Sequence, residues 1–333
     1  MPEFDDSRLD DRDVLARYDA TLRQLALAGA HIRVESAAAA SLRLDPNLRP
    51  RGIVLTGNES RLIRSVAETA CPAPLVAWPH VGLPGWAGPL DLVVAQASGG
   101  PSSALLPTVA EARRRGCALL VAAPSASELA EHVSARDVLV PTTTDDAVAA
   151  VVALMGLLAQ IGLMPAPHAE SVADAADMVA ERCSPHKDLS ANPAKAAAIA
   201  LAEALPLVWG GSMLAARAAR RVAEELRRVT GRPALATPAE DIVPLLATAT
   251  TRDPFADPGD DGLRPVLVTL DDGDDDAASA HARSLLEGIA AERQVRVVEL
   301  ECDDDAGPVG RHVSLLQQGF FAAAYLGVGL DRL

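Results

Sequence analysis

The sequence predicts an α/β protein made of two doubly wound parallel-sheet units, with flavodoxin-like winding, that are joined by helices. Three observations favour this fold. Short apolar runs alternate with helical patterns at the spacing of βαβ units. The run LDLVVAQA at 90–97 is apolar along nearly its whole length, which is typical of a parallel strand buried on both faces. The same order of strand and helix begins again near residue 200.

An N-terminal helical segment is predicted at 1–44, followed by the first unit at 45–144. Within the segment, residues 8–43 carry apolar side chains three and four positions apart, which predicts helix. Each strand of the first unit is an apolar run that a helical pattern follows. The predicted strands are 52–57, 74–79, 90–97, 117–124 and 137–141.

Connecting helices are predicted at 145–199, and the second unit at 200–333. Residues 145–164 are apolar on nearly all sides, which predicts a buried helix. A polar stretch rich in Pro, Gly and Asp at 251–262 predicts a loop. The strands of the second unit are predicted at 205–211, 263–270 and 295–301, and its long helices at 212–231, 279–294 and 310–330.

Charge and composition exclude several classes of partner. The formal net charge of −15 over 333 residues repels nucleic acid and anionic lipid, so neither is expected to bind. No run reaches the roughly 20 apolar residues of a membrane helix, and the acidic N-terminus is unlike a signal peptide, so a cytoplasmic protein is expected. The histidines and the four cysteines lack metal-ligand spacing, and no nucleotide-binding motif is present. We therefore expect no metal and no cofactor.

Two turns of small and hydroxyl residues follow predicted strands, TGNES at 56–60 and ASGGPSS at 97–103. In an open parallel sheet, ligands lie beyond the carboxyl ends of the strands. Glycines, serine hydroxyls and helix N-termini at such turns favour a phosphate. The alternative is that both are ordinary strand–helix turns, whose caps are usually Ser, Asn or Gly. The candidate phosphate-binding residues are Gly57, Ser60, Ser98, Gly99, Ser102 and Ser103.

Four stretches together resemble one family of sugar-phosphate enzymes: GNESRLI, VAWPHVGLPGWAGPLDLVVAQASGGPSS, SANPAKAAAIALAEALPLVWGG and LLQQGFFAAAYLGVGLDRL. On these stretches the chain resembles a divergent member of the bifunctional phosphoglucose/phosphomannose isomerase family of SIS-domain proteins. The resemblance implies interconversion of fructose 6-phosphate with glucose or mannose 6-phosphate, without metal. It also implies a hexose phosphate or similar small anion as ligand, and a homodimer.

The resemblance places only some of the family's phosphate-binding residues. Ser60 corresponds to the serine of the family's first phosphate loop, and Ser98 and Gly99 correspond to the second Ser and the Gly of its second loop. The remaining loop positions are replaced, so altered phosphate binding is expected. Gln96 stands for the first Ser, Gly100 for the Asn and Pro101 for the Thr.

The family's catalytic groups are replaced as well. Arg228 stands where the family has its catalytic glutamate, and an arginine stays protonated and cannot act as the base. Ala239 stands at the position of the ring-opening histidine, and the arginine of the family's first-unit exit loop is missing. Glu225 and Glu240 are candidate catalytic stand-ins; the alternative is that they are paired or capping surface acids.

Two functions remain open after this comparison. One is a phosphosugar-binding isomerase whose catalytic groups have been relocated. The other is a non-catalytic regulatory or scaffolding SIS homologue with no isomerase activity. The apolar final helix, with Phe320, Phe321 and Tyr325, belongs either to a dimer face or to the internal core.

Overall fold

The computed structural model describes residues 3–134, 136–249, 264–273, 276–302 and 304–332. The chain forms two compact units. The first-sheet unit is Ala28–Ala173, and the second-sheet unit is Met1–Leu27 together with Asp174–Leu333. These boundaries differ from those expected at 44/45, 144/145 and 199/200. The stretch 251–262, predicted as a loop, lies outside the described residues.

The first sheet has five strands, all parallel, in the order β2-β1-β3-β4-β5. This is the doubly wound arrangement that the sequence predicts, and each strand falls within its predicted range. β3 is buried along its whole length, as its continuous apolar run requires. The strands are β1 (Ile53–Gly57), β2 (Leu75–Ala77), β3 (Leu92–Gln96), β4 (Ala118–Ala123) and β5 (Val138–Pro141).

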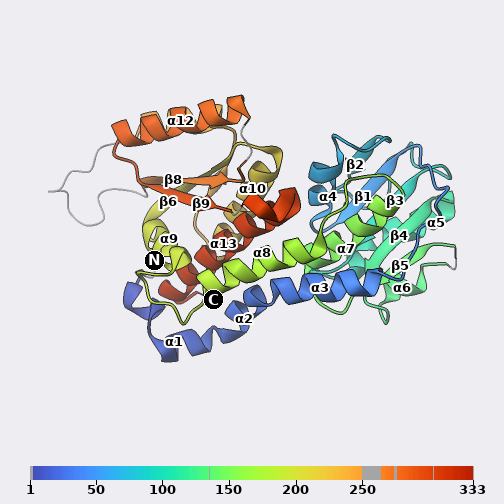
Figure 1. Ribbon diagram of the computed structural model, residues 1–333, viewed down its shortest axis with the longest axis horizontal. Helices are drawn as coiled ribbons and strands as arrows, with labels where there is room; N and C mark the ends of the chain where they lie inside the picture. Colours follow the sequence, from blue (N-terminus) through green and yellow to red (C-terminus); the bar gives the residue numbers. More distant parts are fainter. Residues whose placement is uncertain (1–2, 135, 250–263, 274–275, 303, 333) are drawn as a thin grey trace. The chain divides into compact units, whose positions relative to one another are not determined.

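Helices cover both faces of the first sheet (Figure 1). On one face α7 packs against β3 and β4, and α3 and α4 pack against α7. On the other face, Val109 and Leu129 of α5 and α6 lie in one core with Val93 and Val121 of the strands. The helices are α3 (Ala28–Ala39), α4 (Ser60–Ala67), η2 (Ser102–Leu105), α5 (Leu106–Arg115), α6 (Glu128–Glu131) and α7 (Ala147–Gln160).

The second sheet has four parallel strands in the order β7-β6-β8-β9. Three of them were predicted. The short edge strand β7 was not, because its two residues carry no alternating pattern that distinguishes them from a loop. The strands are β6 (Ala204–Gly210), β7 (Leu235–Ala236), β8 (Arg264–Asp271) and β9 (Val297–Glu301).

Side chains of β6 alternate between two cores. Val208 packs with α9, α10 and α13, whereas Leu207 and Trp209 pack with α11 and α12 on the opposite face. Figure 1 shows α12 on one side of this sheet and α10 and α13 on the other. The helix α11 was not predicted. The helices are α8 (Ala169–Arg182), α9 (Pro193–Leu201), α10 (Met213–Thr230), α11 (Ala239–Ala247), α12 (Ala277–Glu292), η3 (Asp304–Ala306) and α13 (Gly307–Gly329).

The N-terminal segment is helical, as predicted for 8–43, and it is broken into several short helices. The elements η1 (Asp6–Leu9), α1 (Arg12–Arg17) and α2 (Asp19–Ala26) precede α3. The break before α1 occurs because the side chain of Asp11 accepts the amides of Asp13 and Val14 and so caps a new helix.

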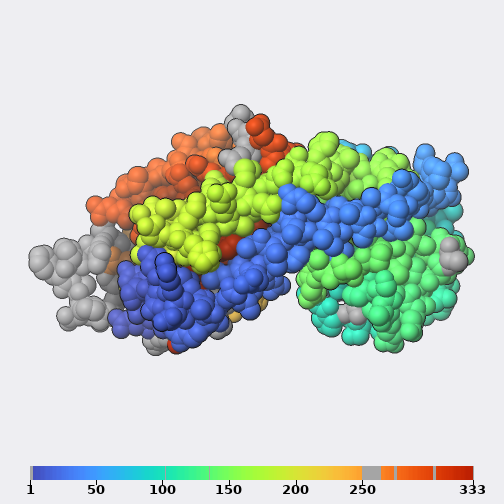
Figure 2. All heavy atoms as spheres, turned by 60° about the horizontal axis from the view of Figure 1, so that its bottom comes forward, coloured from blue at the N-terminus to red at the C-terminus, as the bar shows by residue number. Residues whose placement is uncertain are grey.

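A fully buried lysine holds this segment to the second-sheet unit. Lys195 Nζ donates to Asp10 Oδ1 at 2.8 Å and to the carbonyl oxygens of Pro185 and Lys187 at 3.1 and 2.7 Å. These contacts satisfy all three donors of the ammonium group, as a buried charge requires. In Figure 2 the dark-blue N-terminal residues lie against the yellow-green segment that follows α8.

The final helix α13 is internal to the second-sheet unit. Phe321 and Tyr325 are fully buried in its core, and the Tyr325 hydroxyl donates to the Cys183 carbonyl oxygen at 2.6 Å. The sequence left open whether this helix belongs to a dimer face or to the internal core, and Phe321 and Tyr325 lie in the core. The homodimer remains a prediction, without the support of their side chains.

Across the described part of the chain, none of the helices combines the length and apolar character that crossing a bilayer requires.

Close packing of α13 on α10 depends on Gly319. A Cβ atom at this position would lie 2.2 Å from Cγ2 of Val222, a side chain of restricted rotamers. We therefore expect Gly319→Ala to lower the free energy of unfolding by about 1–3 kcal/mol, although alanine is the better helix former. Urea titration monitored by circular dichroism measures this change.

The matched control is Gly288→Ala on α12, where a Cβ meets nothing within 4 Å. This variant should be more stable than the wild type by roughly 0.5–1 kcal/mol. Adding Val222→Ala to the Gly319→Ala chain should recover part of the loss. Equal effects of the two glycine substitutions would contradict the contact.

Candidate functional site

The first sheet reverses its winding direction between β1 and β3, which are neighbours although β2 lies between them in sequence. In open α/β sheets, ligands bind in the crevice that such a reversal leaves at the carboxyl ends of the strands. The loops that follow β1 and β3 are the two hydroxyl-rich turns singled out from the sequence. Their position in the topology is therefore that of a ligand site.

The structure brings these two turns into direct contact. Asn58 Nδ2 donates to the carbonyl oxygens of Gly99 at 2.7 Å and Ser98 at 3.3 Å. Gly57 has φ +100°, and a Cβ there would lie 1.9 Å from the Gln96 carbonyl oxygen. Gly100 makes room for the Asn58 amide, 2.8 Å from where its Cβ would be. The glycines thus allow the close approach, and the Asn58 side chain bridges the loops.

The serines of the two turns lie in different surroundings. Ser60 is the buried first residue of α4, and Glu59 before it adopts the left-handed conformation at φ 56°. The hydroxyl of Ser98 is buried and has no hydrogen-bond partner among the described residues. Ser103 is exposed on η2. The side chain of Ser102 lies outside the described part of the chain.

The backbone N–H that the resemblance would assign to a phosphate donates instead to a carboxylate of the chain. Asp145 Oδ1 accepts the backbone N–H of Gly99 at 2.7 Å. This N–H belongs to the loop after β3, and a hydrogen bond to a charged acceptor is strong. A phosphate that binds at this N–H must displace Asp145 or meet its negative charge.

The buried side chain of Gln96 is hydrogen-bonded to the loop that follows β3. Its Nε2 donates to the Ser98 carbonyl oxygen at 2.9 Å, and its Oε1 is buried without a partner among the described residues. The residue that replaces the family's first phosphate serine therefore acts on the loop backbone.

A buried glutamate on α3 fixes the loop that carries Asp145. Glu35 Oε1 accepts the backbone amides of Thr143 and Thr144 at 2.9 and 2.6 Å, and the Thr144 hydroxyl at 2.7 Å. Glu35 is fully buried. Its carboxylate therefore determines the path of the chain from β5 into α7.

Asp146 links this loop to His31 on α3. Its Oδ1 caps α7 by accepting the amides of Val148 and Ala149, while its Oδ2 lies 3.4 Å from His31 Nδ1. The hydrogen bond to Asp146 raises the pKa of His31 against the opposing effect of burial. The sequence reasoning missed these roles, although two acids directly before an apolar helix are a recognised N-cap pattern. Glu35, inside an alanine-rich helix, gave no such signal.

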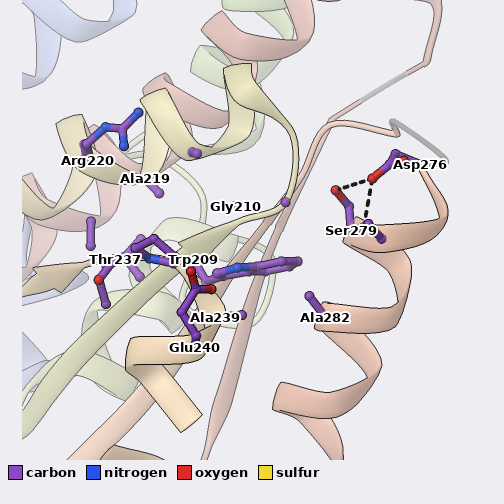
Figure 3. A pocket seen from close by; sticks show the side chains of 16 residues that line it. Trp209, Gly210, Ala219, Arg220, Thr237, Ala239, Glu240, Asp276, Ser279 and Ala282 are labelled. Carbon is purple, nitrogen blue, oxygen red and sulfur yellow. Dashed lines mark hydrogen bonds between the residues drawn. The ribbon is translucent and has the colours of Figure 1, made fainter.

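The candidate catalytic stand-ins belong to the second-sheet unit. Glu225 forms an ion pair with Arg228, with Oε2 2.8 Å from Nε, and this contact raises the pKa of Arg228. The carboxylate that was proposed as a base is thus engaged by the arginine at the family's glutamate position. Ala239 is the first residue of α11, and Glu240 follows it on the wall of a pocket (Figure 3).

No group of three or more His, Cys, Asp or Glu side chains arranged to hold a metal occurs within the residues that the structure covers.

Comparison with known proteins agrees with this fold. Residues 190–331 match the model of the bacterial phospho-glucose isomerase C-terminal SIS domain. Among curated proteins, no sequence matches this chain.

Three solved structures illustrate the likeness. A candidate phosphosugar isomerase from Clostridium difficile 630 is 14% identical with a TM-score of 0.65, and 91% of each chain is covered. A candidate sugar-binding protein from Salmonella typhimurium LT2 is 16% identical with a TM-score of 0.61, covering 93% of this chain and 99% of that one. The C-terminal domain of glucosamine-fructose-6-phosphate aminotransferase from Francisella tularensis is 14% identical with a TM-score of 0.55, covering 92% and 96%. At these identities the likeness shows the fold, and the predicted SIS fold is confirmed.

The contact between His31 and Asp146 predicts a pH-dependent stability. Because the pKa of His31 is raised above its ordinary 6.5, its protonated form stabilises the folded state. This contribution is fully present below pH 6.5 and is lost as the pH rises through the raised pKa. We expect wild type to exceed His31→Gln in unfolding free energy at low pH, with the difference shrinking through this window.

Urea titrations over roughly pH 5 to 8 measure the difference. The control is His168→Gln, at an exposed histidine of the same unit. A difference between wild type and His31→Gln that stays constant with pH would contradict the assignment.

Proposed function

We propose that this chain, which has the SIS fold and matches a SIS-domain model over residues 190–331, serves phosphosugar metabolism as a non-isomerising regulatory or scaffolding homologue. The single observation that carries this proposal is the hydrogen bond from the Gly99 amide to Asp145 at 2.7 Å. The chain's own carboxylate takes the place where a sugar phosphate would be anchored. Asn58 closes the same crevice by bridging its two loops.

The chemistry of aldose–ketose isomerisation supports the same conclusion. The reaction needs a base that moves a proton between C1 and C2, and a group that opens the sugar ring. Arg228 and Ala239, at the positions the family uses for these steps, provide neither. Glu225 is engaged by Arg228, which leaves it poorly placed to accept a substrate proton.

A second candidate function is binding of a hexose 6-phosphate at these loops without turnover. The observation that favours it is the hydroxyl of Ser98, which is buried and unpartnered among the described residues. A buried hydroxyl without a partner costs free energy, and a phosphate oxygen would satisfy it. Binding by this route requires the Asp145 carboxylate to leave the Gly99 amide.

A coupled assay separates isomerisation from these alternatives. We expect no formation of fructose 6-phosphate from glucose 6-phosphate or mannose 6-phosphate by the purified chain, since Arg228 and Ala239 supply neither a base nor a ring-opening group. An established phosphoglucose isomerase in the same assay is the positive control. Turnover that disappears in Glu225→Gln or Glu240→Gln would overturn the proposal in favour of relocated catalytic groups.

The role of Asp145 is tested by Asp145→Asn, which keeps an acceptor for the Gly99 amide and removes the charge. We expect this variant to bind fructose 6-phosphate at least about tenfold more tightly than the wild type, as measured by calorimetry. Glu170→Gln is the matched control, because it removes one charge at an exposed ion pair with Arg33 in the same unit. An affinity unchanged by Asp145→Asn would contradict the closing role of this carboxylate.

A further inference from the structure

The winding direction of the second sheet also reverses, between the neighbouring strands β6 and β8. A pocket of about 400 Å³ lies at the carboxyl end of β6. The pocket is formed by the carboxyl end of β6, the residues after β7 and the first residues of α11 and α12. Its volume is within the range of small-molecule sites. Nothing assigned so far to the first-sheet unit uses it.

Trp209 gives the pocket an apolar floor. Its side chain is directed to the α11 and α12 face of the sheet and is 4% exposed. Figure 3 shows its indole lying between Glu240 and Ala282, with small side chains on the surrounding walls. Only a small part of this indole borders the pocket, and the small side chains of the walls leave space beside it for a compact ligand.

Polar side chains line the pocket around Trp209. Glu240 is exposed at the start of α11, and Thr237 before it has its hydroxyl 2.8 Å from Asp241 Oδ2. On the other wall, Asp276 caps α12 by accepting the amide and the hydroxyl of Ser279 at 3.0 and 3.2 Å. Carboxylate oxygens and hydroxyls are suitable partners for the hydroxyl groups of a ligand.

The charges of the residues that line the pocket disfavour a phosphorylated ligand. Two carboxylates, Glu240 and Asp276, line the pocket, and Arg220 is the one cation among its lining residues. The whole chain carries a net charge of −15, which adds to this bias. An unphosphorylated ligand avoids the repulsion while still using the acceptors.

We propose that this pocket binds a neutral monosaccharide, with its ring between the small apolar walls beside Trp209 and its hydroxyls on Glu240 and the neighbouring hydroxyl groups. The site is separate from the loops of the first-sheet unit and does not depend on the function proposed for them. It gives the protein a sensor for an unphosphorylated sugar on a fold whose relatives include candidate phosphosugar isomerases.

Trp209 supplies the readout. The chain has three tryptophans, and the other two, Trp78 and Trp86, lie in the first-sheet unit. In a chain carrying Trp78→Phe and Trp86→Phe, the remaining emission comes from Trp209 alone. We expect glucose or mannose to change this emission saturably, and glucose 6-phosphate to bind at least about tenfold more weakly than glucose.

Variants then locate the binding. Ala278→Phe, at an exposed position of the pocket wall, should abolish the response by filling the space, and Glu240→Gln should weaken binding at least about fivefold. Glu292→Gln, an equal charge change at the far end of α12, should leave it unchanged. Asp145→Asn should also leave it unchanged, which distinguishes this site from the first-sheet crevice.

Three results would overturn the proposal. One is the absence of a saturable response to either neutral sugar in a chain whose circular dichroism matches the wild type. Another is a response that survives Ala278→Phe. The third is tighter binding of glucose 6-phosphate than of glucose, which would show that the carboxylates of the lining do not govern the choice of ligand.

Discussion

The buried carboxylate of Glu35 is the constraint on which the first-sheet crevice depends. It accepts two backbone amides of the loop that follows β5, and so positions Asp145 and Asp146. Asp146 then starts α7, and Asp145 reaches the Gly99 amide. A buried carboxyl group needs hydrogen bonds, and Oε1 of Glu35 makes them, whereas its Oε2 has no partner among the described residues. The contacts of Glu35 therefore hold the loop that carries Asp145 next to the Gly99 amide.

The two sheets share their winding but differ in what fills the reversal point. In the first sheet, Asn58 bridges the two loops and Asp145 accepts the Gly99 amide, so polar groups of the chain itself lie at the reversal point. In the second sheet, small residues and the indole of Trp209 leave a pocket, and acidic side chains surround it. The same topology thus carries different loop side chains at its two reversal points, and ligand chemistry depends on such side chains.

Most of the sheet structure was predictable because each buried parallel strand is a short apolar run between helical patterns. The apolar pattern did not predict a strand that is very short, or the breaks between helices that follow one another directly. β7 has only two residues, and the N-terminal helices share one periodicity although Asp11 caps a new start. Residues 1–27 belong to the second-sheet unit and make contacts such as Asp10 with Lys195, 185 positions apart, which no local pattern shows.

The amino-acid order alone predicted the fold class and located the two hydroxyl-rich turns, because both depend on residues near one another in the chain. Which groups the turns contact depends on partners distant in sequence. Asp145 lies 46 positions from Gly99, and Glu35 lies 108 positions from Thr143. Hydrogen bonds over such separations exist only once the chain has folded, and they decide whether an amide faces a ligand or the protein's own carboxylate.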